Sequence, residues 1–231
     1  AHLEAELDKS LTRLGIDHID LFYIHRRDKD TPIEQVTETL ASMVKSGKIG
    51  GFGFSEIAPT SLYKAAAIHE VTAVQSEYSL SVRSPEMGLL QATAELGITL
   101  VAFSPLGRSL LTDKPPSISK AQSIPFLKPN PRFNEPNLSA NVLATKNFRD
   151  LASEFGVSAA ALAIAWLLHK GSNIIPIPGT RSVEHLREHC YGASKQLSAD
   201  EMSLIETALP IGWAHGDRYS DQQWVGPERY C

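Results

Sequence analysis

Apolar residues along the chain recur with two periods that alternate, and this alternation predicts helices and strands in turn. The segment from Leu3 to Leu14 has leucine at every third or fourth position, which predicts an amphipathic helix that ends at Gly15. Ile19 to His25 is instead a short apolar run followed by a charged cluster, a pattern typical of a buried parallel strand. We therefore expect His25 at the carboxyl end of that strand.

The same two patterns repeat along the chain as far as Leu209. Short apolar runs predict four more strands, at 49–54, 73–78, 98–103 and 173–177. Helical periodicity predicts further helices at about 32–47, 59–69, 85–97, 141–155, 159–169, 182–191 and 198–209. Strands that alternate with helices are joined by helical crossovers, so we expect an α/β fold with a parallel sheet.

Residues that cap helices mark where several of these helices begin. Thr31-Pro32-Ile33-Glu34 and Ser198-Ala199-Asp200-Glu201 both have the sequence of a capping box. Ser84, Ser158 and Ser182 precede three other helices as single N-cap residues. We expect these side chains to accept hydrogen bonds from the first turn of each helix.

Two segments lack either period. Seven prolines lie between Ser104 and about Ala140, so we expect residues 104–140 to form a long loop that is functional or disordered. The tail at 210–231 holds Trp213, Trp224 and Tyr230 without a period. We expect this tail to be an irregular segment that lies on the body of the protein.

The composition narrows the class of protein. With 231 residues, 42% hydrophobic residues and a net charge of −4, the chain suits a soluble globular protein with one large core or two smaller ones. A mildly acidic balance gives no support for nucleic-acid binding. The apolar run from Ala159 to Leu168 is too short to span a bilayer, so it predicts a buried helix and no membrane partner.

Cysteine and histidine spacing point to no disulfide framework and no metal site. Cys190 and Cys231 suit a reducing compartment, so we expect a cytoplasmic protein. The histidines lack the spacing of metal ligands. The chain begins without Met and with its apolar pattern under way by Leu3, which suggests that sequence upstream is missing.

Five motifs, in their order and spacing, give the chain a resemblance to a known family. They are Ile19–Arg27 (IDLFYIHRR), Lys48–Glu56 (KIGGFGFSE), Val74–Leu80 (VQSEYSL), Val101–Leu106 (VAFSPL) and Ile177–Leu186 (IPGTRSVEHL). Together they cover nearly the whole chain, which resembles the aldo-keto reductases. The SEYSL and GTR sequences are similar to those of the fungal and bacterial pyridoxal-reductase-like branch.

The resemblance implies that residues 1–231 form one domain, a (β/α)8 TIM barrel of aldo-keto reductase type. With about five of eight strands, that barrel would be incomplete and would lack its first three β-α units, and residues 104–140 would be an active-site loop. The implied activity is NADPH-dependent reduction of aldehydes or ketones to alcohols by hydride transfer. The substrate would be a small carbonyl compound, with pyridoxal as one candidate, and the oligomeric state is left open.

The family's active site uses an Asp, a Tyr, a Lys and a His, and only the histidine carries over, to His25. The other three belong to the first strands of the barrel and have no equivalent in this sequence. An imidazole at a strand end can orient a carbonyl but does not replace a Tyr–Lys pair as the acid. Tyr23 shares the face of His25 roughly 6–7 Å deeper, where core packing is the favoured role. A histidine that merely ends a strand is the plain alternative for His25.

The resemblance also implies a set of residues that hold NADPH. Ser55 and Gln75 match positions that hydrogen-bond the nicotinamide carboxamide, and Phe103 matches the aromatic residue that stacks on the nicotinamide. The other matches are Ser104, Pro105, Leu106, Gly107 and Ser109 along the pyrophosphate, Gly179, Thr180 and Arg181 at the 2'-phosphate, and Glu188 and His189 near the adenine. A helix cap is the structural alternative for Ser55 and a solvated surface charge for Arg181, while Glu56 replaces the Asn of many relatives.

Two other hypotheses stay open at this point. The first is a catalytically impaired cofactor-binding or regulatory subunit, similar to the potassium-channel β-subunits of the same fold, because the acid Tyr is absent from this chain. The second is a fragment that does not fold stably alone, since an open five-stranded sheet exposes two edges and an unfilled interior. That second hypothesis predicts low thermal stability or pairing with a partner.

Overall fold

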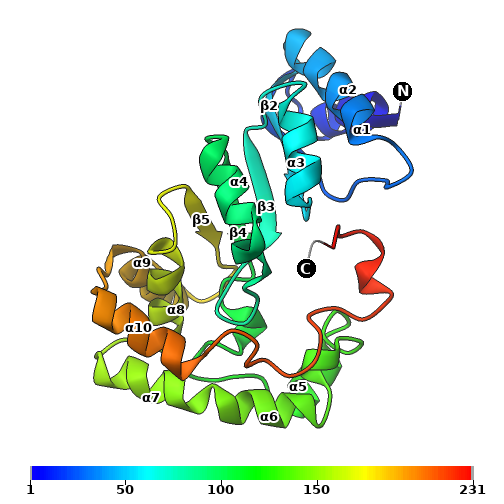
Figure 1. Cartoon of the computed structure of the whole chain (residues 1–231). Helices are drawn as coiled ribbons and strands as arrows, with labels where there is room; N and C mark the ends of the chain where they lie inside the picture. Colours follow the sequence, from blue (N-terminus) through cyan, green and yellow to red (C-terminus); the bar gives the residue numbers. More distant parts are fainter. Residues whose placement is uncertain (1, 230–231) are drawn as a thin grey trace. The chain divides into compact units, whose positions relative to one another are not determined.

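A computed structural model of the chain describes residues 2–229. The chain divides into two compact units, the first made of Ala1–Ser76, Met87–Leu100 and Gly226–Cys231, the second of Glu77–Glu86 and Val101–Val225. Within the predicted tail, Tyr230 and Cys231 lie outside the described residues. Each unit has its own helices, strands and core (Figure 1).

The first unit alternates helices and strands. Its elements are α1 (His2–Leu14), β1 (Ile19–Ile24), α2 (Ile33–Lys45), β2 (Ile49–Ser55), α3 (Pro59–Ala66), most of β3 (Ala73–Glu77), α4 (Leu89–Glu95) and the start of β4 (Thr99–Phe103). The crossover helices α2 and α3 connect β1 to β2 and β2 to β3, as the alternating apolar periods predict.

The second unit is mainly helical. Apart from the short 3-10 turns, its elements are α5 (Ile118–Ser123), α6 (Asn137–Ala144), α7 (Lys146–Glu154), α8 (Ala159–Leu168), β5 (Ile174–Ile177), α9 (Val183–Ser194) and α10 (Ala199–Ala208). The 3-10 turns are η1 (Ser84–Met87), of which Met87 belongs to the first unit, η2 (Gly107–Ser109), η3 (Pro131–Phe133) and η4 (Gln223–Val225). Figure 1 shows α8 and α9 next to each other, joined through β5.

The five predicted strands are all present, each within one residue of its predicted bounds. Their order in the sheet follows the chain, β1-β2-β3-β4-β5. β1 pairs with β2 and β2 with β3 in parallel, so that Ile24 lies opposite Phe54 and Ser55 lies opposite Gln75. The prediction of a parallel α/β sheet is confirmed, and the carboxyl ends of β1, β2 and β3 lie at one edge.

The core of the first unit is built from β2 and the helices packed with it. Phe52 and Phe54 on β2 are almost completely buried, and Leu7 of α1 and Leu40 of α2 have no exposed surface. The leucine pattern of α1 is confirmed only in part, because Leu14 at the end of the helix is 63% exposed.

α8 is the most deeply buried element of the second unit. Every residue from Ala159 to Leu167 is buried, so this apolar run is a buried helix as predicted. Trp166 packs edge-on against Tyr78, with 5.7 Å between the ring centroids. A Cβ on Gly192 of α9 would lie 2.4 Å from the backbone oxygen of Ala161, so only glycine allows this close approach of α9 to α8. No single helix among the described residues is long and apolar enough to cross a membrane. Two consecutive segments, Asn137–Glu154 (α6 and α7) and Ala159–Leu168 (α8), reach that length and hydropathy only together, and the chain bends by 88° between them.

The segment 104–140, predicted as a long loop, contains short helices and a small core of its own. α5, η3 and the start of α6 lie in it. Leu110, Ala121, Leu127, Phe133 and Leu138 form a buried cluster there. Each of these short helices contributes only one residue to the cluster, so no helical period is visible in the sequence. The absence of structure was therefore a wrong prediction, whereas a role at an active site stays a prediction.

Three of the predicted helix caps are confirmed. The hydroxyl groups of Ser158, Ser182 and Ser198 each accept a hydrogen bond from a backbone N–H in the first turn of α8, α9 and α10. Glu201 completes a capping box, because its carboxylate accepts a hydrogen bond from the backbone N–H of Ser198 at 2.7 Å. These caps satisfy N–H groups that have no partner inside the helix.

Three other helices differ from their predicted form. The capping box at Thr31 is wrong: α2 begins at Ile33, and the Thr31 hydroxyl donates to Asp28 at 2.9 Å instead. The helix predicted at 85–97 is divided into η1 and α4, because Gly88 between them has a φ of 127°. The helix predicted at 141–155 is two helices, α6 and α7, which meet at Thr145.

Candidate functional site

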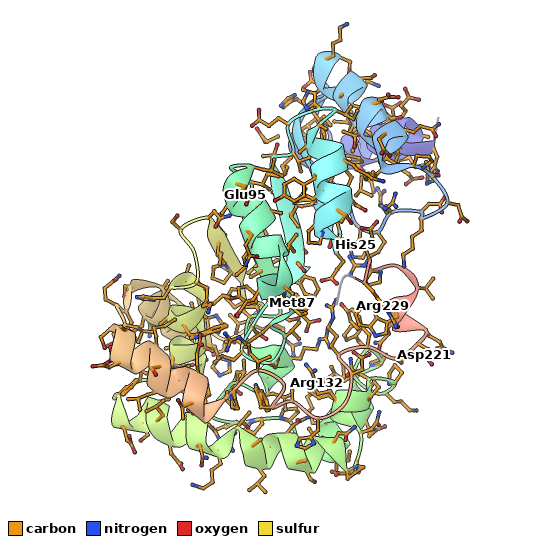
Figure 2. The ribbon with its side chains drawn as sticks, in the orientation of Figure 1. His25, Met87, Glu95, Arg132, Asp221 and Arg229 are labelled. Atoms are coloured by element: carbon orange, nitrogen blue, oxygen red, sulfur yellow. The ribbon has the colours of Figure 1, made fainter. Side chains whose placement is uncertain are left out.

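The carboxyl ends of β1, β2 and β3 carry three of the predicted site residues, all in the first unit. Ser55 lies opposite Gln75 in the parallel pairing, and His25 follows Ile24, which pairs with Phe54. His25, labelled in Figure 2, is exposed, while Gln75 is half-buried and Ser55 is buried. An imidazole, a hydroxyl and an amide therefore stand on neighbouring strand ends, where parallel sheets usually carry their function.

Ser55 has a hydrogen-bond partner from the end of the neighbouring strand. Nη1 of Arg26 donates to Ser55 Oγ at 2.8 Å and also to the backbone oxygen of His25. A guanidinium group only donates, so this bond leaves the proton of the Ser55 hydroxyl for another acceptor. A capping role for Ser55 is not supported, because α3 begins at Pro59 with Ala58 as its N-cap residue.

Glu56 and Tyr23, two other residues near these strand ends, are held by the protein itself. Glu56 is buried, and its carboxylate accepts a hydrogen bond from Ser76 Oγ at 3.2 Å. Its backbone N–H donates to the backbone oxygen of Gln75 at 2.8 Å. Burial raises the pKa of Tyr23, which makes the phenol a weaker acid. The structure thus supports core packing rather than proton donation for Tyr23.

The segment that follows β4, in the second unit, has an unusual backbone. Ser104, Gly107, Arg108 and Ser109 have positive φ values between 51° and 76°. Non-glycine residues in this region cost about 1–3 kcal/mol each and gather at ligand sites. Leu106, with a φ of −98°, lies among them. The change from right-handed Leu106 to left-handed Gly107 is the one point in 106–109 at which successive backbone N–H groups can turn toward an anion.

Arg108 and Gly107 hold this segment in place. Nη2 of Arg108 donates to the buried carboxylate of Glu77 at 2.7 Å, and Nη1 donates to the backbone oxygen of Arg218 at 2.9 Å. A Cβ on Gly107 would come within 2.8 Å of Ser81 Oγ. The backbone after β4 is therefore fixed by a charge-assisted hydrogen bond and by close packing.

A pocket in the second unit joins the segment after β4 to the start of α9. Its volume is about 270 Å³. Six of the predicted cofactor residues line it: Leu106, Ser109, Gly179, Thr180, Glu188 and His189. The two groups come from segments far apart in the chain, so the fold brings together two clusters that the sequence predicts separately.

His189 has an unusual environment in this pocket. Its side chain is 6% exposed, and its Nδ1 is buried without a hydrogen-bond partner among the described residues. Burial lowers the pKa of its imidazole, an effect that nearby Glu188 opposes and His185 reinforces. A buried ring nitrogen without a partner is costly, which makes His189 an exception among the buried polar groups of the described residues.

Five other predicted cofactor residues of the second unit do not line the pocket. They are Phe103, Ser104, Pro105, Gly107 and Arg181. Phe103 is half-buried at the end of β4, and Gly107 is buried beneath the segment that follows. Arg181 is exposed in the loop before α9, which agrees with the alternative of a solvated charge as well as with a ligand contact.

Six lining residues were not predicted from the sequence to hold the cofactor. They are Thr112, Asp113, Lys114, Ala160, Glu184 and His185. Asp113 Oδ1 accepts a hydrogen bond from the backbone N–H of Ala159 at 3.2 Å, which holds this part of the lining to the start of α8. Lys114 adds a positive charge that suits a phosphate group. The one feature of the sequence that could have pointed to Lys114 was its place in residues 104–140, the segment predicted to be functional.

The part of the chain that the structure describes offers no candidate metal site. Residues 2–229 contain no group of three or more His, Cys, Asp and Glu side chains placed to hold a metal ion. Cys190 on α9 is free and exposed. The pocket of the second unit and the strand ends of the first unit are thus two separate candidate sites, each described within its own unit.

Comparison with known proteins identifies the family that these motifs resemble. The model of the Aldo/keto reductase family matches residues 1–210. The aldo-keto reductase yakc (NADP(+)) of Schizosaccharomyces pombe is 38% identical over 222 residues, which cover 94% of this chain and 65% of that protein. Probable aldo-keto reductase 1 of Glycine max is 37% identical over 92% of this chain and 61% of its own length. The chain thus spans less than two thirds of the length of these curated relatives.

Solved structures of similar proteins share the fold. The glycerol dehydrogenase AKR11B4 of Gluconobacter oxydans matches with a TM-score of 0.77 and 26% identity over 90% of this chain and 63% of its own. The thermostable aldo-keto reductase Tm1743, solved with the inhibitor epalrestat, matches with a TM-score of 0.70 and 28% identity over 89% of this chain and 65% of its own. An α/β fold similar to that of barrel-type aldo-keto reductases is confirmed, and the absence of the first three β-α units stays a prediction.

Proposed function

Because the chain belongs to the aldo/keto reductase family, we propose that it binds NADPH and takes part in reducing a carbonyl compound to an alcohol by hydride transfer. The observation that carries the proposal is the pocket in which Leu106 and Ser109 meet Thr180, Glu188 and His189. The similarity to yakc, whose name includes NADP(+), supports the same cofactor for this chain.

Beside the carboxylates of Asp113, Glu184 and Glu188, the pocket has features that suit the phosphate groups of NADPH. The amino-terminal turns of α9, a helix of 12 residues, contribute to the lining, and the positive end of a helix attracts anions. Lys114 adds a charge within the lining. Arg181 presents an exposed guanidinium just before the helix, and such a group can hold a 2'-phosphate with two parallel hydrogen bonds.

Two further details suit a dinucleotide. The imidazole of His189 lines the pocket and would pack against an adenine ring placed there. The left-handed backbone from Gly107 to Ser109 follows Leu106, and such a change of hand would let backbone N–H groups approach a pyrophosphate. Both features are energetically unfavourable without a ligand, and contacts with a bound cofactor would offset that free energy.

The strand ends of the first unit would act at the reacting end of the cofactor. NADPH supplies the hydride when it is bound. Ser55, whose proton is left for an acceptor, and Gln75 would hold the carboxamide and so choose which face of the nicotinamide meets the substrate. His25 would donate a hydrogen bond to the carbonyl oxygen, where negative charge develops.

Titration of the purified protein with NADPH and NADH tests the cofactor. We expect a change in NADPH fluorescence on binding and a clear preference for NADPH over NADH. Arg181→Ala is expected to reduce this preference about tenfold, because hydrogen bonds to a charged group contribute roughly 1.5–3 kcal/mol. Arg187→Ala, which removes another exposed arginine, on α9 rather than in the loop before it, is the matched control. Wild-type protein that leaves NADPH fluorescence unchanged would contradict the proposal.

Turnover separates the enzyme from the regulatory alternative. Loss of NADPH absorbance is measured with pyridoxal, the candidate suggested by the pyridoxal-reductase-like motifs, and with 4-nitrobenzaldehyde as a general carbonyl substrate. Consumption of NADPH that depends on the carbonyl compound supports a reductase. Tight NADPH binding without turnover of either compound favours a cofactor-binding regulatory subunit.

A further inference from the structure

The C-terminal tail is bound to the first unit next to the predicted catalytic histidine. The tail from Gly226 belongs to this unit, although the residues before it belong to the second. Figure 2 labels Arg229 on this tail and His25 at the end of β1. The tail touches Arg26 and Arg27, the two residues that follow His25.

Glu228 is the anchor of the tail. Its carboxylate accepts a hydrogen bond from Nε of Arg27 through Oε1 and one from the backbone N–H of Ala58 through Oε2, at 2.7 Å. Ala58 is the N-cap residue of α3 and has no side-chain cap of its own, so Glu228 places a negative charge at the positive end of that helix. The backbone N–H of Glu228 also donates to the backbone oxygen of Glu56 at 2.9 Å. Three hydrogen bonds on one buried residue fix the position of the tail.

Gly226 presses the tail onto Arg26. A Cβ on Gly226 would lie 2.6 Å from Cγ of Arg26, 2.9 Å from its Cδ and 3.1 Å from its Cβ. The tail backbone therefore lies against the aliphatic part of that side chain, with no space for a larger residue. The guanidinium at the far end donates to Ser55 Oγ at 2.8 Å and to the backbone oxygen of His25.

We propose that the tail from Gly226 to Glu228 is a clasp that sets Arg26 on Ser55, so that the Ser55 hydroxyl is presented as a hydrogen-bond donor to the nicotinamide carboxamide. Arg26 is a positioning residue, because it acts through Ser55. The order of dependence runs from Glu228, which fixes the tail, through Gly226, which confines Arg26, to Ser55. This inference rests on the proposed binding of NADPH.

The clasp makes a prediction that a plain structural fastening does not. If the tail only stabilised the fold, its loss would weaken the binding of every ligand equally. If it is a clasp, its loss weakens only ligands that contain the nicotinamide. NADPH contains it, whereas adenosine 2',5'-bisphosphate has only the adenosine end, so the ratio of the two affinities isolates the effect on the strand-end residues.

Calorimetric titration of the whole protein with both ligands tests the clasp. Arg26→Met keeps the apolar stem and removes the donors, and we expect it to weaken NADPH about tenfold while the affinity for adenosine 2',5'-bisphosphate stays within about twofold. Arg26→Lys keeps a donor and is expected to restore part of the loss. Glu228→Gln, which keeps the shape but removes the charge, is expected to weaken NADPH about threefold. Glu6→Gln, in an exposed ion pair with Lys9, is the matched control and is expected to change neither ligand.

Two results would overturn the clasp. The first is an unchanged NADPH affinity in Arg26→Met. The second is an equal loss for both ligands, which would make the tail a structural fastening only. Wild-type protein that binds neither ligand would reject the proposed function itself, and the clasp with it, so the two failures are told apart by the wild-type titration.

Discussion

The ring of Tyr23 lies against Gly53, its partner on the neighbouring parallel strand. The two residues are paired in the register of β1 and β2. A Cβ on Gly53 would lie 2.6 Å from Cε1 of Tyr23 and 2.6 Å from the backbone oxygen of Ala73 on β3. The glycine-rich sequence of β2 is thus required by close packing across three strands.

Gly53→Ala is expected to destabilise the protein by about 1–3 kcal/mol, because the new methyl group meets a backbone atom that cannot move aside. The free energy of unfolding from urea titration measures the effect. Gly179→Ala is the control, since a Cβ there would meet nothing within 4 Å. Equal stability of the two variants would show that β1, β2 and β3 do not pack in this way.

The burial of α8 predicts a large cavity effect. Leu162 has no exposed surface, whereas Leu143 on α6 is 72% exposed. Leu162→Ala is expected to cost about 2–5 kcal/mol, and Leu143→Ala less than about 0.5 kcal/mol. Thermal unfolding of both variants checks this difference, and a similar loss in both would place α8 outside the core.

The two capping-box sequences give a matched pair of variants. Ser198→Ala removes a real cap and is expected to cost about 1 kcal/mol. Thr31→Ala removes a hydroxyl that only contacts Asp28 at the surface, so its expected cost is less than about 0.5 kcal/mol. A greater loss of unfolding free energy in Thr31→Ala than in Ser198→Ala would show that Thr31 caps α2 after all.

The lowered pKa of His189 predicts that the free energy of unfolding decreases in mild acid. Burial lowers its pKa in the folded protein below the ordinary 6.5, so the unfolded chain binds a proton more readily than the folded chain. Stability from this group is present above that ordinary value and decreases as the pH falls below it. His189→Asn should therefore lose less unfolding free energy than the wild type between pH 7.5 and 5.5, measured by urea titration. An identical change in both proteins would contradict the lowered pKa.

Local patterns were enough to predict the strands of the two units and the positions of most of their longer helices. The apolar runs located all five strands, because a buried parallel strand is apolar on both faces. Gly15 ended its helix as predicted, and Gly47, Gly97 and Gly156 follow the ends of α2, α4 and α7, each of the four with a φ between 67° and 76°. Serine caps were recognisable because their hydrogen bonds span only three residues.

Relationships between distant segments could not be predicted from such patterns. Glu228 caps α3 across 170 positions of sequence, and no local period marks it. Asp113 and Lys114 enter the pocket from a segment whose short helices conceal its core. The candidate cofactor residues were accessible only through the order and spacing of motifs, and their role stays a prediction.

Hydrogen exchange with and without NADPH tests most directly the central claim, that the segment after β4 and the start of α9 form one cofactor pocket. We predict that saturating NADPH slows exchange of backbone amides in 104–114 and in 179–189 together, while the amides of α7 are unaffected. Protection of only one of these two segments, or of neither, would contradict the account.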